Sequence, residues 1–524
     1  MKFRLEKNIT QGPILEQIIR NRGYDKDYFT NSLDDLADMY LMKDLEKAAK
    51  RIIKAIAHKE KIIIFGHDDI DGITSTYILF DFLEKAGSQA HYYYIPNRLL
   101  ENHGLQKNFI RKVKDGKFDL VITVDGGISS WQAVDEINAM GTDVIITDHH
   151  LIPKKLPRAL ALVDSKQQDC NFPYTMLAGV GVSWYLCKML AEKLNIELKP
   201  EYLFWTALGT VADKAPLDGL NRIIVKEVLT NWYNYENPVT SALSNYLWSG
   251  SNIISRLAVI RYLIKLLSNG RDADGKHKAL YFMLNPQREK NSTLKELIAE
   301  MRQWDEKLSS TREIIDKFRP DPQKFGFIFF DKNDDIALEC LGLAASLLSR
   351  KYKVPVLFLK RKDDIITCEA RCTKGFDLME MFNYFSDMLI QFGGHVKAAG
   401  FTMSEKNLKS FIKHFYEYTI ARQDVISSEW KHQIDAVFSA EQIRLFEKFV
   451  QEDYEKLQPF GQGNPEPIYL MQNFNPVRNS KKFSQKEMIF EEDNEYDVVF
   501  KLQGSNIKVL DFFPINERDK VELK

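Results

Sequence analysis

Three aspartates lie within four positions of one another, at Asp68, Asp69 and Asp71. The apolar run before them, 62–65, predicts a buried strand, and residues 73–83 follow with helical spacing. Ligands of open α/β sheets bind at the carboxyl ends of strands, where this acidic loop would lie. Carboxylates this close repel one another, so a fold keeps them together when a cation neutralises their charge. A solvated acidic turn is the alternative interpretation.

Further apolar segments also end in acids or imidazoles. They are Leu120–Val124 before Asp125, Val144–Thr147 before Asp148, His149 and His150, and Ala207–Asp213, which ends at Asp213. We expect these segments to be strands whose carboxyl ends form one site at one edge of a parallel sheet. Carboxylates together with imidazoles suit Mn²⁺, Mg²⁺ or Zn²⁺ better than calcium or an iron–sulfur cluster. Bridging aspartates fit two ions about 3.5–4 Å apart, the arrangement used for displacement at phosphorus.

The elements that must position these residues follow from the pattern of the chain. Strands and helices alternate through the first half, which predicts an α/β fold with a doubly wound, mostly parallel sheet. Apolar strands at 326–330 and 354–359 begin a second, smaller α/β domain, and short alternating segments at 496–502 and 507–513 suit an OB-like β-barrel with no domain after it. The expected divisions are a helical lead-in (1–58), the catalytic domain (59–230), a helical connector with a long linking helix (231–320), a substrate-binding domain (321–423) and the barrel (424–524).

Composition limits the class of protein. The 524 residues include 72 Lys and Arg against 73 Asp and Glu, so net charge alone gives no nucleic-acid footprint. Hydrophobic residues make up 44% of the chain, which argues against global disorder. The five cysteines form no CxxC pair, and the N-terminus lacks the apolar core of a signal peptide. We therefore expect a cytoplasmic protein that does not span a membrane.

Several motifs together resemble one known family. They are the acidic loop, the Asp148-His149-His150 triplet, ALGTVAD at 207–213, GGHVKAAGF at 393–401 and LQPFGQGNPEP at 457–467, and they occur in that family's order. The chain resembles the RecJ single-strand-specific exonucleases of the DHH phosphoesterase superfamily from about residue 29 to 515. Asp164 departs from the family, which usually has Asn at this position.

The resemblance implies a site for two divalent cations, Mn²⁺ first and Mg²⁺ second. Its expected metal ligands are His67, Asp69, Asp71, Asp125, His149 and Asp213. Asp125 is expected to bridge the ions, His150 to contact the scissile phosphate, and Asp148 to orient the imidazoles. His67 departs from the family, whose loop usually has an acid there; imidazole is a competent ligand for Mn²⁺ or Zn²⁺.

The same resemblance implies a set of substrate-binding residues. They are Arg98, His103, Arg371, Gly393, Gly394 and His395. An arginine fork suits phosphate oxygens, and glycines let the backbone approach a phosphate closely. In the barrel, Lys481, Lys482, Phe483 and Lys486 are candidates for holding a single strand, and a charged hairpin face is the alternative.

The implied activity is two-metal hydrolysis of single-stranded DNA from the 5′ end to mononucleotides, in DNA repair and recombination. The implied partners are single-stranded DNA, a single-strand-binding protein and a helicase, with the enzyme a monomer. Two alternatives stay open: a DHH phosphodiesterase of short oligonucleotides or cyclic dinucleotides, and a non-catalytic repair or replication scaffold. The family's short-substrate enzymes generally lack the 457–467 stretch and the extra barrel, whereas scaffold relatives typically lose metal ligands.

Overall fold

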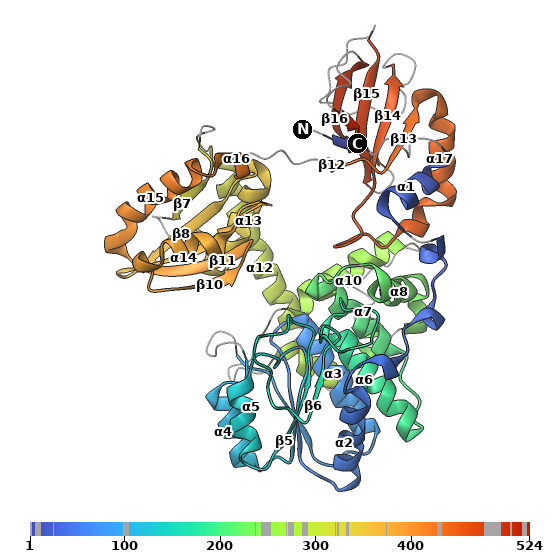
Figure 1. The fold of residues 1–524 in the computed structure, drawn as a ribbon, viewed down its shortest axis with the longest axis vertical. Helices are drawn as coiled ribbons and strands as arrows, with labels where there is room; N and C mark the ends of the chain where they lie inside the picture. The colour runs from blue at the N-terminus through green and yellow to red at the C-terminus, as the bar shows by residue number, and fades with distance from the viewer. Residues whose placement is uncertain are drawn as a thin grey trace. The chain divides into compact units, whose positions relative to one another are not determined.

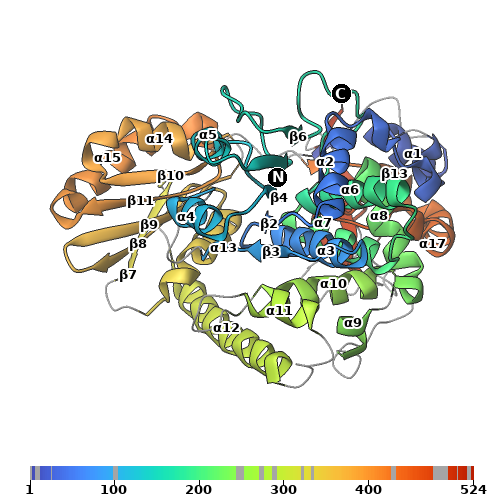
Figure 2. The ribbon, with the colours of Figure 1, turned by 90° about the horizontal axis from the view of Figure 1, so that it is seen from below.

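The computed structural model forms two compact units, one of residues 3–298 with 432–524 and the other of residues 1–2 with 299–431 (Figures 1 and 2). The structure describes residues 3–5, 12–24, 26–97, 104–235, 237–242, 253–268, 270, 277–285, 292–319, 321, 324–331, 335–373, 375–426, 432–475, 494–503, 506–515 and 521–523.

The larger unit contains a parallel sheet with strand order β3-β2-β4-β5-β6. Its strands are β2 (Ile62–Phe65), β3 (His91–Tyr94), β4 (Leu120–Thr123), β5 (Asp143–Thr147) and β6 (Ala161–Val163). Every residue of β2 and β4 is buried, as expected for strands covered by helices on both faces. The register pairs Phe65 with Thr123, so neighbouring strands deliver their following loops to one edge.

Helices cover both faces of this sheet (Figures 1 and 2). On one face lie α4 (Lys107–Gly116) and α5 (Trp131–Asn138), whose apolar side chains share a core with Ile63 and Val121. The other face is covered by α2 (Leu45–Ala57), α3 (Ile70–Lys85) and α6 (Gly179–Leu194). This confirms the predicted doubly wound α/β class.

The predicted strand at 207–213 is wrong, because these residues end the helix α7 (Glu201–Asp213). Residues 202–210 are all buried, so the segment is apolar all round and shows no 3.6-residue period. Gly209 lets α7 pack closely on its neighbours: a Cβ there would lie 2.5 Å from the Thr74 hydroxyl oxygen and 2.8 Å from a methyl group of Val180. The helix still ends at Asp213.

The described residues after α7 are helical up to the second unit. The helices are α8 (Gly219–Thr230), α9 (Pro238–Ala242), α10 (Ile253–Leu267), α11 (Lys278–Leu284) and α12 (Ser292–Lys317). The longest of them is α12, which passes from one compact unit into the other. This agrees with the expected long linking helix.

The second unit is built on a mixed sheet of order β10-β11-β9-β8-β7. Its strands are β7 (Phe327–Asp331), β8 (Val356–Lys362), β9 (Ile365–Arg371), β10 (Gln391–His395) and β11 (Ala398–Ser404). Only β7 and β8 pair in parallel; the other described pairs of this sheet are antiparallel. Helices α13 (Leu341–Tyr352), α14 (Leu378–Tyr384) and α15 (Leu408–Ile420) accompany it, so this is the expected second, smaller α/β domain.

The C-terminal part of the larger unit is a sheet of order β13-β14-β15-β16, and its described strands do not close into the expected barrel. The strands are β13 (Ala436–Ser439), β14 (Ile468–Phe474), β15 (Tyr496–Gln503) and β16 (Asn506–Pro514), with α17 (Ile443–Glu452) between the first two. The candidates Lys481, Lys482, Phe483 and Lys486 lie outside the described residues.

The N-terminal helix α1 (Ile14–Arg22) packs on this C-terminal sheet rather than on the first strands. The Gln17 side chain donates to the Val437 carbonyl at 3.0 Å and accepts from the Val437 N–H at 2.9 Å. Arg22 forms a buried ion pair with Asp435 at 2.6 Å. Segments more than 400 positions apart are therefore one structural layer.

Arg222 links the catalytic half of this unit to its C-terminal half. Its side chain is 1% exposed, and its guanidinium lies 4.2 Å from the Tyr28 ring centre. It donates to the carbonyls of Tyr28, Lys456 and Gln458 at 2.8, 2.7 and 3.2 Å. The arginine therefore satisfies backbone groups that have few other donors within reach.

We expect Arg222→Ala to lower the free energy of unfolding by about 3 kcal/mol, because it leaves buried carbonyls without donors. Urea unfolding followed by tryptophan fluorescence measures this loss. Arg158→Ala is the matched control, since its side chain is 81% exposed and pairs only at the surface with Asp135. Equal stability of the two variants would refute the linking role of Arg222.

Candidate active site

The acidic loop begins where β2 ends, and its geometry depends on close packing against α3. A Cβ at Gly66 would lie 2.0 Å from the Thr76 hydroxyl oxygen, so only glycine fits there. Asp69 is the N-cap of α3 and accepts from the Gly72 N–H at 3.0 Å. Its other oxygen, Oδ2, lies 2.9 Å from Nδ1 of His67. The loop thus presents one carboxylate and one imidazole together.

Asp71 lies one turn further, inside the first turn of α3, and is 2% exposed. Its two oxygens accept from the N–H groups of Gly179 and Val180, at 2.7 and 2.8 Å. These are the first residues of α6, whose N–H groups lack partners within the helix. Burial raises the pKa of Asp71 to about 7; His149 opposes this rise, and Asp213 adds to it.

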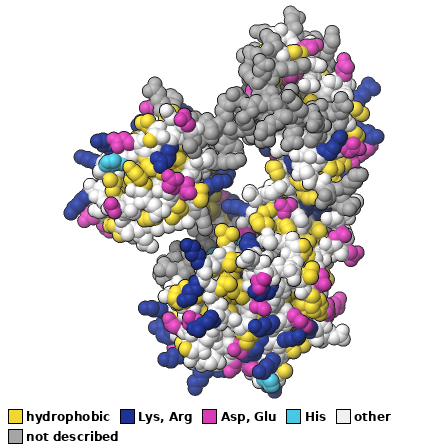
Figure 3. Space-filling view, viewed as in Figure 1, with side chains coloured by type: hydrophobic (Ala, Val, Ile, Leu, Met, Phe, Trp, Pro, Cys, Tyr) yellow, Lys and Arg dark blue, Asp and Glu magenta, His cyan; other side chains and the backbone are white. Residues whose placement is uncertain are grey.

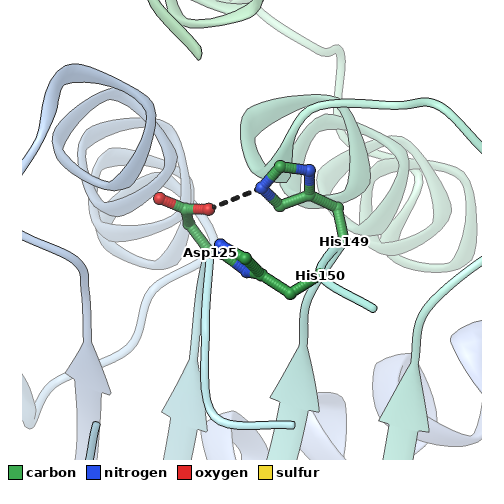
Figure 4. A group of neighbouring side chains, drawn as sticks. All are labelled: Asp125, His149 and His150. Carbon is green, nitrogen blue, oxygen red and sulfur yellow. Dashed lines mark ion pairs between the residues drawn. The ribbon is translucent and has the colours of Figure 1, made fainter. Parts of the chain in front are cut away.

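Asp125 occupies the centre of the site and is 2% exposed (Figure 4). It follows β4 with a φ of 55°, in the left-handed region that aspartate tolerates better than most residues. Its Oδ1 lies 3.0 Å from Nε2 of His149, and its Oδ2 lies 3.8 Å from Nδ1 of His67. Burial and the neighbouring carboxylates of Asp71 and Asp69 raise its pKa well above the usual value. A cation between these groups would remove that penalty.

Asp148 faces backbone donors and His150 rather than the centre of the cluster. One oxygen accepts from the Ile128 N–H at 2.9 Å, and the other accepts from the His149 N–H and from Nδ1 of His150, both at 2.7 Å. Burial alone would raise the pKa of Asp148, but the hydrogen bond from His150 lowers it below the usual value. The same hydrogen bond raises the pKa of His150. Asp148 therefore fixes the ring of His150 and favours its protonated form.

The side chains form three overlapping groups of metal-ligand type, each with donor atoms within 4.8 Å of one another. The groups are His67, Asp69 and Asp125; Asp71, His149 and Asp213; and Asp125, His149 and His150. Asp125 and His149 each belong to two groups. Nε2 of His149 is buried and lies 3.0 Å from Asp125 without the alignment of a hydrogen bond, which fits two ligands sharing a cation.

All the predicted metal ligands therefore lie together, although their assignment to ions stays a prediction. The predicted substrate residues Arg98 and His103 lie outside the described residues. Arg371, Gly393, Gly394 and His395 belong to the second compact unit.

Within the second unit, Arg371 donates to Glu369 at 2.9 Å and to the Ala370 carbonyl at 2.8 Å. The Gly-Gly-His stretch is part of β10, paired antiparallel with β11. Gly394 has a φ of 134°, and a Cβ there would lie 2.5 Å from the Cα of Ala399. Gly394 is therefore required by strand packing, whereas a Cβ on Gly393 would meet nothing within 4 Å.

Asp164 is a further carboxylate at this edge that the sequence analysis did not assign to the site. It follows β6, so the pattern of an apolar strand ending in an acid was present for it too. Its side chain is fully buried, Oδ1 accepts from the Lys166 N–H at 2.8 Å, and Oδ2 has no hydrogen-bond partner among the described residues. Burial raises its pKa to about 6. Lys166 in turn donates to the His149 carbonyl.

Because the folded-state pKa of Asp164 lies above its usual value of 3.8, its ionised form destabilises the fold at pH above about 6. This penalty disappears as the pH falls toward the unfolded value. We expect Asp164→Asn to raise the free energy of unfolding by about 3 kcal/mol at pH 8 and by little at pH 4. Urea unfolding at both pH values in a chelator measures the difference. A gain that is independent of pH would contradict the ionisation argument.

Comparison with protein families agrees with this architecture. The model described as "DHH family, N-terminal domain" matches residues 61–210, and the "DHHA1 domain" model matches residues 327–421. The parallel sheet with its acid and imidazole cluster and the second α/β unit thus define a two-domain DHH protein.

The relatives narrow this class further. Single-stranded-DNA-specific exonuclease RecJ of Bacillus subtilis is 30% identical over 96% of this chain and 66% of its own length, and RecJ of Escherichia coli is 27% identical over 87% and 83%. A manganese-bound exonuclease RecJ structure superposes with a TM-score of 0.63 at 26% identity, covering 74% of this chain and 97% of its own. RecJ of Thermus thermophilus with Mn²⁺ has the same fold, with a TM-score of 0.73 at 21% identity over 98% and 79%. The chain belongs to the RecJ-type branch of the DHH family.

Two further observations bear on the expectations from composition. All five cysteines are free thiols. Among the described residues, we find no helix with the length and apolar character needed to cross a bilayer.

Proposed function

We propose that the protein is a divalent-metal-dependent exonuclease that hydrolyses single-stranded DNA from the 5′ end to mononucleotides, in DNA repair and recombination. The observation that supports this most directly is the position of Asp125 between two imidazole-bearing ligand groups, which suits a pair of ions. The relatives named as single-stranded-DNA-specific exonucleases supply the substrate and, through the family resemblance, the polarity.

The proposed cofactors are two divalent cations, with Mn²⁺ preferred and Mg²⁺ as the alternative. The preference for Mn²⁺ follows from imidazoles among the ligands and from the manganese-bound relative. When bound, such ions lower the pKa of a water molecule and neutralise charge that develops on the phosphate. The proposed ligands are Asp69 and His67 on one side, Asp71, His149 and Asp213 on the other, and Asp125 shared between them.

We assign His150 to the substrate phosphate. Its ring is held by Asp148 through Nδ1, which leaves Nε2 as the outward donor, and its side chain is 55% exposed. Because Asp148 raises the pKa of His150, the imidazolium form can hold a non-bridging oxygen or protonate the leaving oxygen. Asp148 acts through His150 and is the residue that positions it.

The remaining substrate contacts are proposed from the family resemblance. Arg371, Gly393, Gly394 and His395 of the second unit are the proposed phosphate-binding group, and Arg98 and His103 the proposed contacts from the catalytic domain. A strand-specific enzyme needs duplex opened and the product strand kept single, so a helicase and a single-strand-binding protein are the proposed partners. We further propose a cytoplasmic monomer, in keeping with the free thiols.

We expect Asp125→Ala to lower hydrolysis more than about 1,000-fold, because loss of the shared ligand removes several kcal/mol of transition-state stabilisation. The assay is digestion of a long single strand labelled at the 5′ end, with Mn²⁺ present. Asp169→Ala is the control, since that carboxylate is 71% exposed and pairs only with Lys43.

Release of labelled mononucleotide by the wild type supports the proposal. Cleavage restricted to oligonucleotides of a few residues would instead identify a short-substrate phosphodiesterase. Binding without cleavage under Mn²⁺, Mg²⁺ or Zn²⁺ would identify a scaffold. Full activity of Asp125→Ala would refute the assignment of the metal site.

A further inference from the structure

A second concave surface lies on the catalytic sheet, between its edge strand β3 and helix α4. We call it the α4 groove; it has a volume of about 730 Å³ and is lined by Tyr92, Tyr94, Phe118, Lys61, Arg111 and Lys112, among others. β3 is the edge of the sheet, so no further strand covers this side. None of these residues belongs to the groups of metal-ligand type.

The floor of the groove is aromatic. Tyr92 and Tyr94 are two positions apart on one strand and therefore face the same side. Tyr92 is 48% exposed, with its ring edge-on to Phe118 at 5.4 Å between centres. Tyr94 is anchored against Phe109 at 5.3 Å. A half-exposed tyrosine held upright by packing offers a rigid face for stacking.

The rim of the groove is cationic. Lys112 places its ammonium 5.9 Å from the centre of the Tyr94 ring, and Arg111 points its guanidinium toward Asn108 at 3.4 Å. No described acidic side chain forms an ion pair with either cation. Asp115 is the acidic residue among the lining residues.

The charge around the groove is concentrated in sequence as well as in space. Residues 107–117 contain five basic residues and one acidic residue, a local charge of +4 in a chain whose net charge is −1. Figure 3 shows Lys and Arg side chains gathered around α4. This local field attracts polyanions, while the balanced charge of the whole chain does not.

The groove leads toward the metal edge of the sheet. Lys61 precedes β2, whereas Tyr94, near the far end of the groove, is in register with Phe65, which ends β2 just before the acidic loop. Four strand residues span about 13 Å, which corresponds to a few nucleotides. A strand whose end lies in the metal site would therefore reach the groove without a long gap.

We propose that the α4 groove is a second binding site for single-stranded nucleic acid, with bases stacked on Tyr92 and phosphates held by Arg111 and Lys112. Stacking on an aromatic ring needs no particular base, and a cationic rim follows the backbone, so the site would bind strands without strong sequence preference. The proposal rests on the proposed function for its substrate: the groove would hold the uncut portion of the strand while its end is hydrolysed.

The first experiment measures binding of a 3′-fluorescein-labelled 30-nucleotide single strand by anisotropy, with full-length protein in a chelator. We expect Tyr92→Ala to raise Kd about tenfold, as loss of one stacked base would do. Tyr92→Phe, which keeps the ring, should bind like the wild type. The double variant Arg111→Ala/Lys112→Ala should also weaken binding and flatten its dependence on salt by about 1.4, or 0.7 per phosphate contact.

The matched control is Lys47→Ala/Lys54→Ala, which removes two exposed cations from α2 on the opposite face of the sheet. We expect this control to bind the 30-mer as tightly as the wild type. Circular dichroism of each variant checks that the fold is kept. If the control and the groove variants weaken binding equally, the effect is general surface charge and the proposal is overturned.

The second experiment separates this proposal from the proposed function. With Mn²⁺, the groove variants should raise KM about tenfold for a 30-mer and leave kcat, and KM for a trinucleotide, unchanged. Wild-type hydrolysis of the 30-mer with unchanged KM and Kd in the groove variants would refute the groove alone. An inactive wild type that binds the 30-mer through Tyr92 would refute the proposed function and leave the groove standing.

Discussion

The repulsion among carboxylates that are buried together is the constraint on which the rest of the structure depends. Asp71 and Asp125 are each 2% exposed, and the pKa of each is raised first by burial and then by neighbouring acids. A fold that holds such groups together without a counter-charge is destabilised by them at neutral pH. The imidazoles of His67 and His149 lie between them but supply at most part of that charge. The arrangement is thus suited to receive cations.

The surrounding elements hold this unfavourable cluster in place through backbone donors and close packing. The first turn of α6 donates two N–H groups to Asp71, and the backbone after β4 and β5 donates to Asp148. A Cβ at Gly179 would lie 2.6 Å from that of Asp125, so the helix can approach the central carboxylate only because a glycine begins it. The N-terminal end of a helix also favours negative charge nearby. Position and electrostatics are therefore supplied by the same element.

The prediction from sequence worked where a local pattern and a structural consequence coincide. An apolar run followed by an acid identified β2, β4 and β5 and the side chains at their carboxyl ends. It misled at α7, where burial on all sides removed the periodicity that distinguishes helix from strand. It overlooked Asp164, although the same pattern of strand and acid is present there, because its significance lies in an oxygen without a partner.

The sequence by itself determined the α/β class and the order of the strand-ending acids and imidazoles, because hydrophobic alternation and turn residues act over a few neighbouring positions. Only the tertiary structure decided which of them share a cation site, that α1 packs against strand β13, and that Arg222 joins both halves of the larger unit. These contacts join residues up to 420 positions apart. Their energies depend on mutual burial and hydrogen-bond geometry, which exist only once the chain has folded.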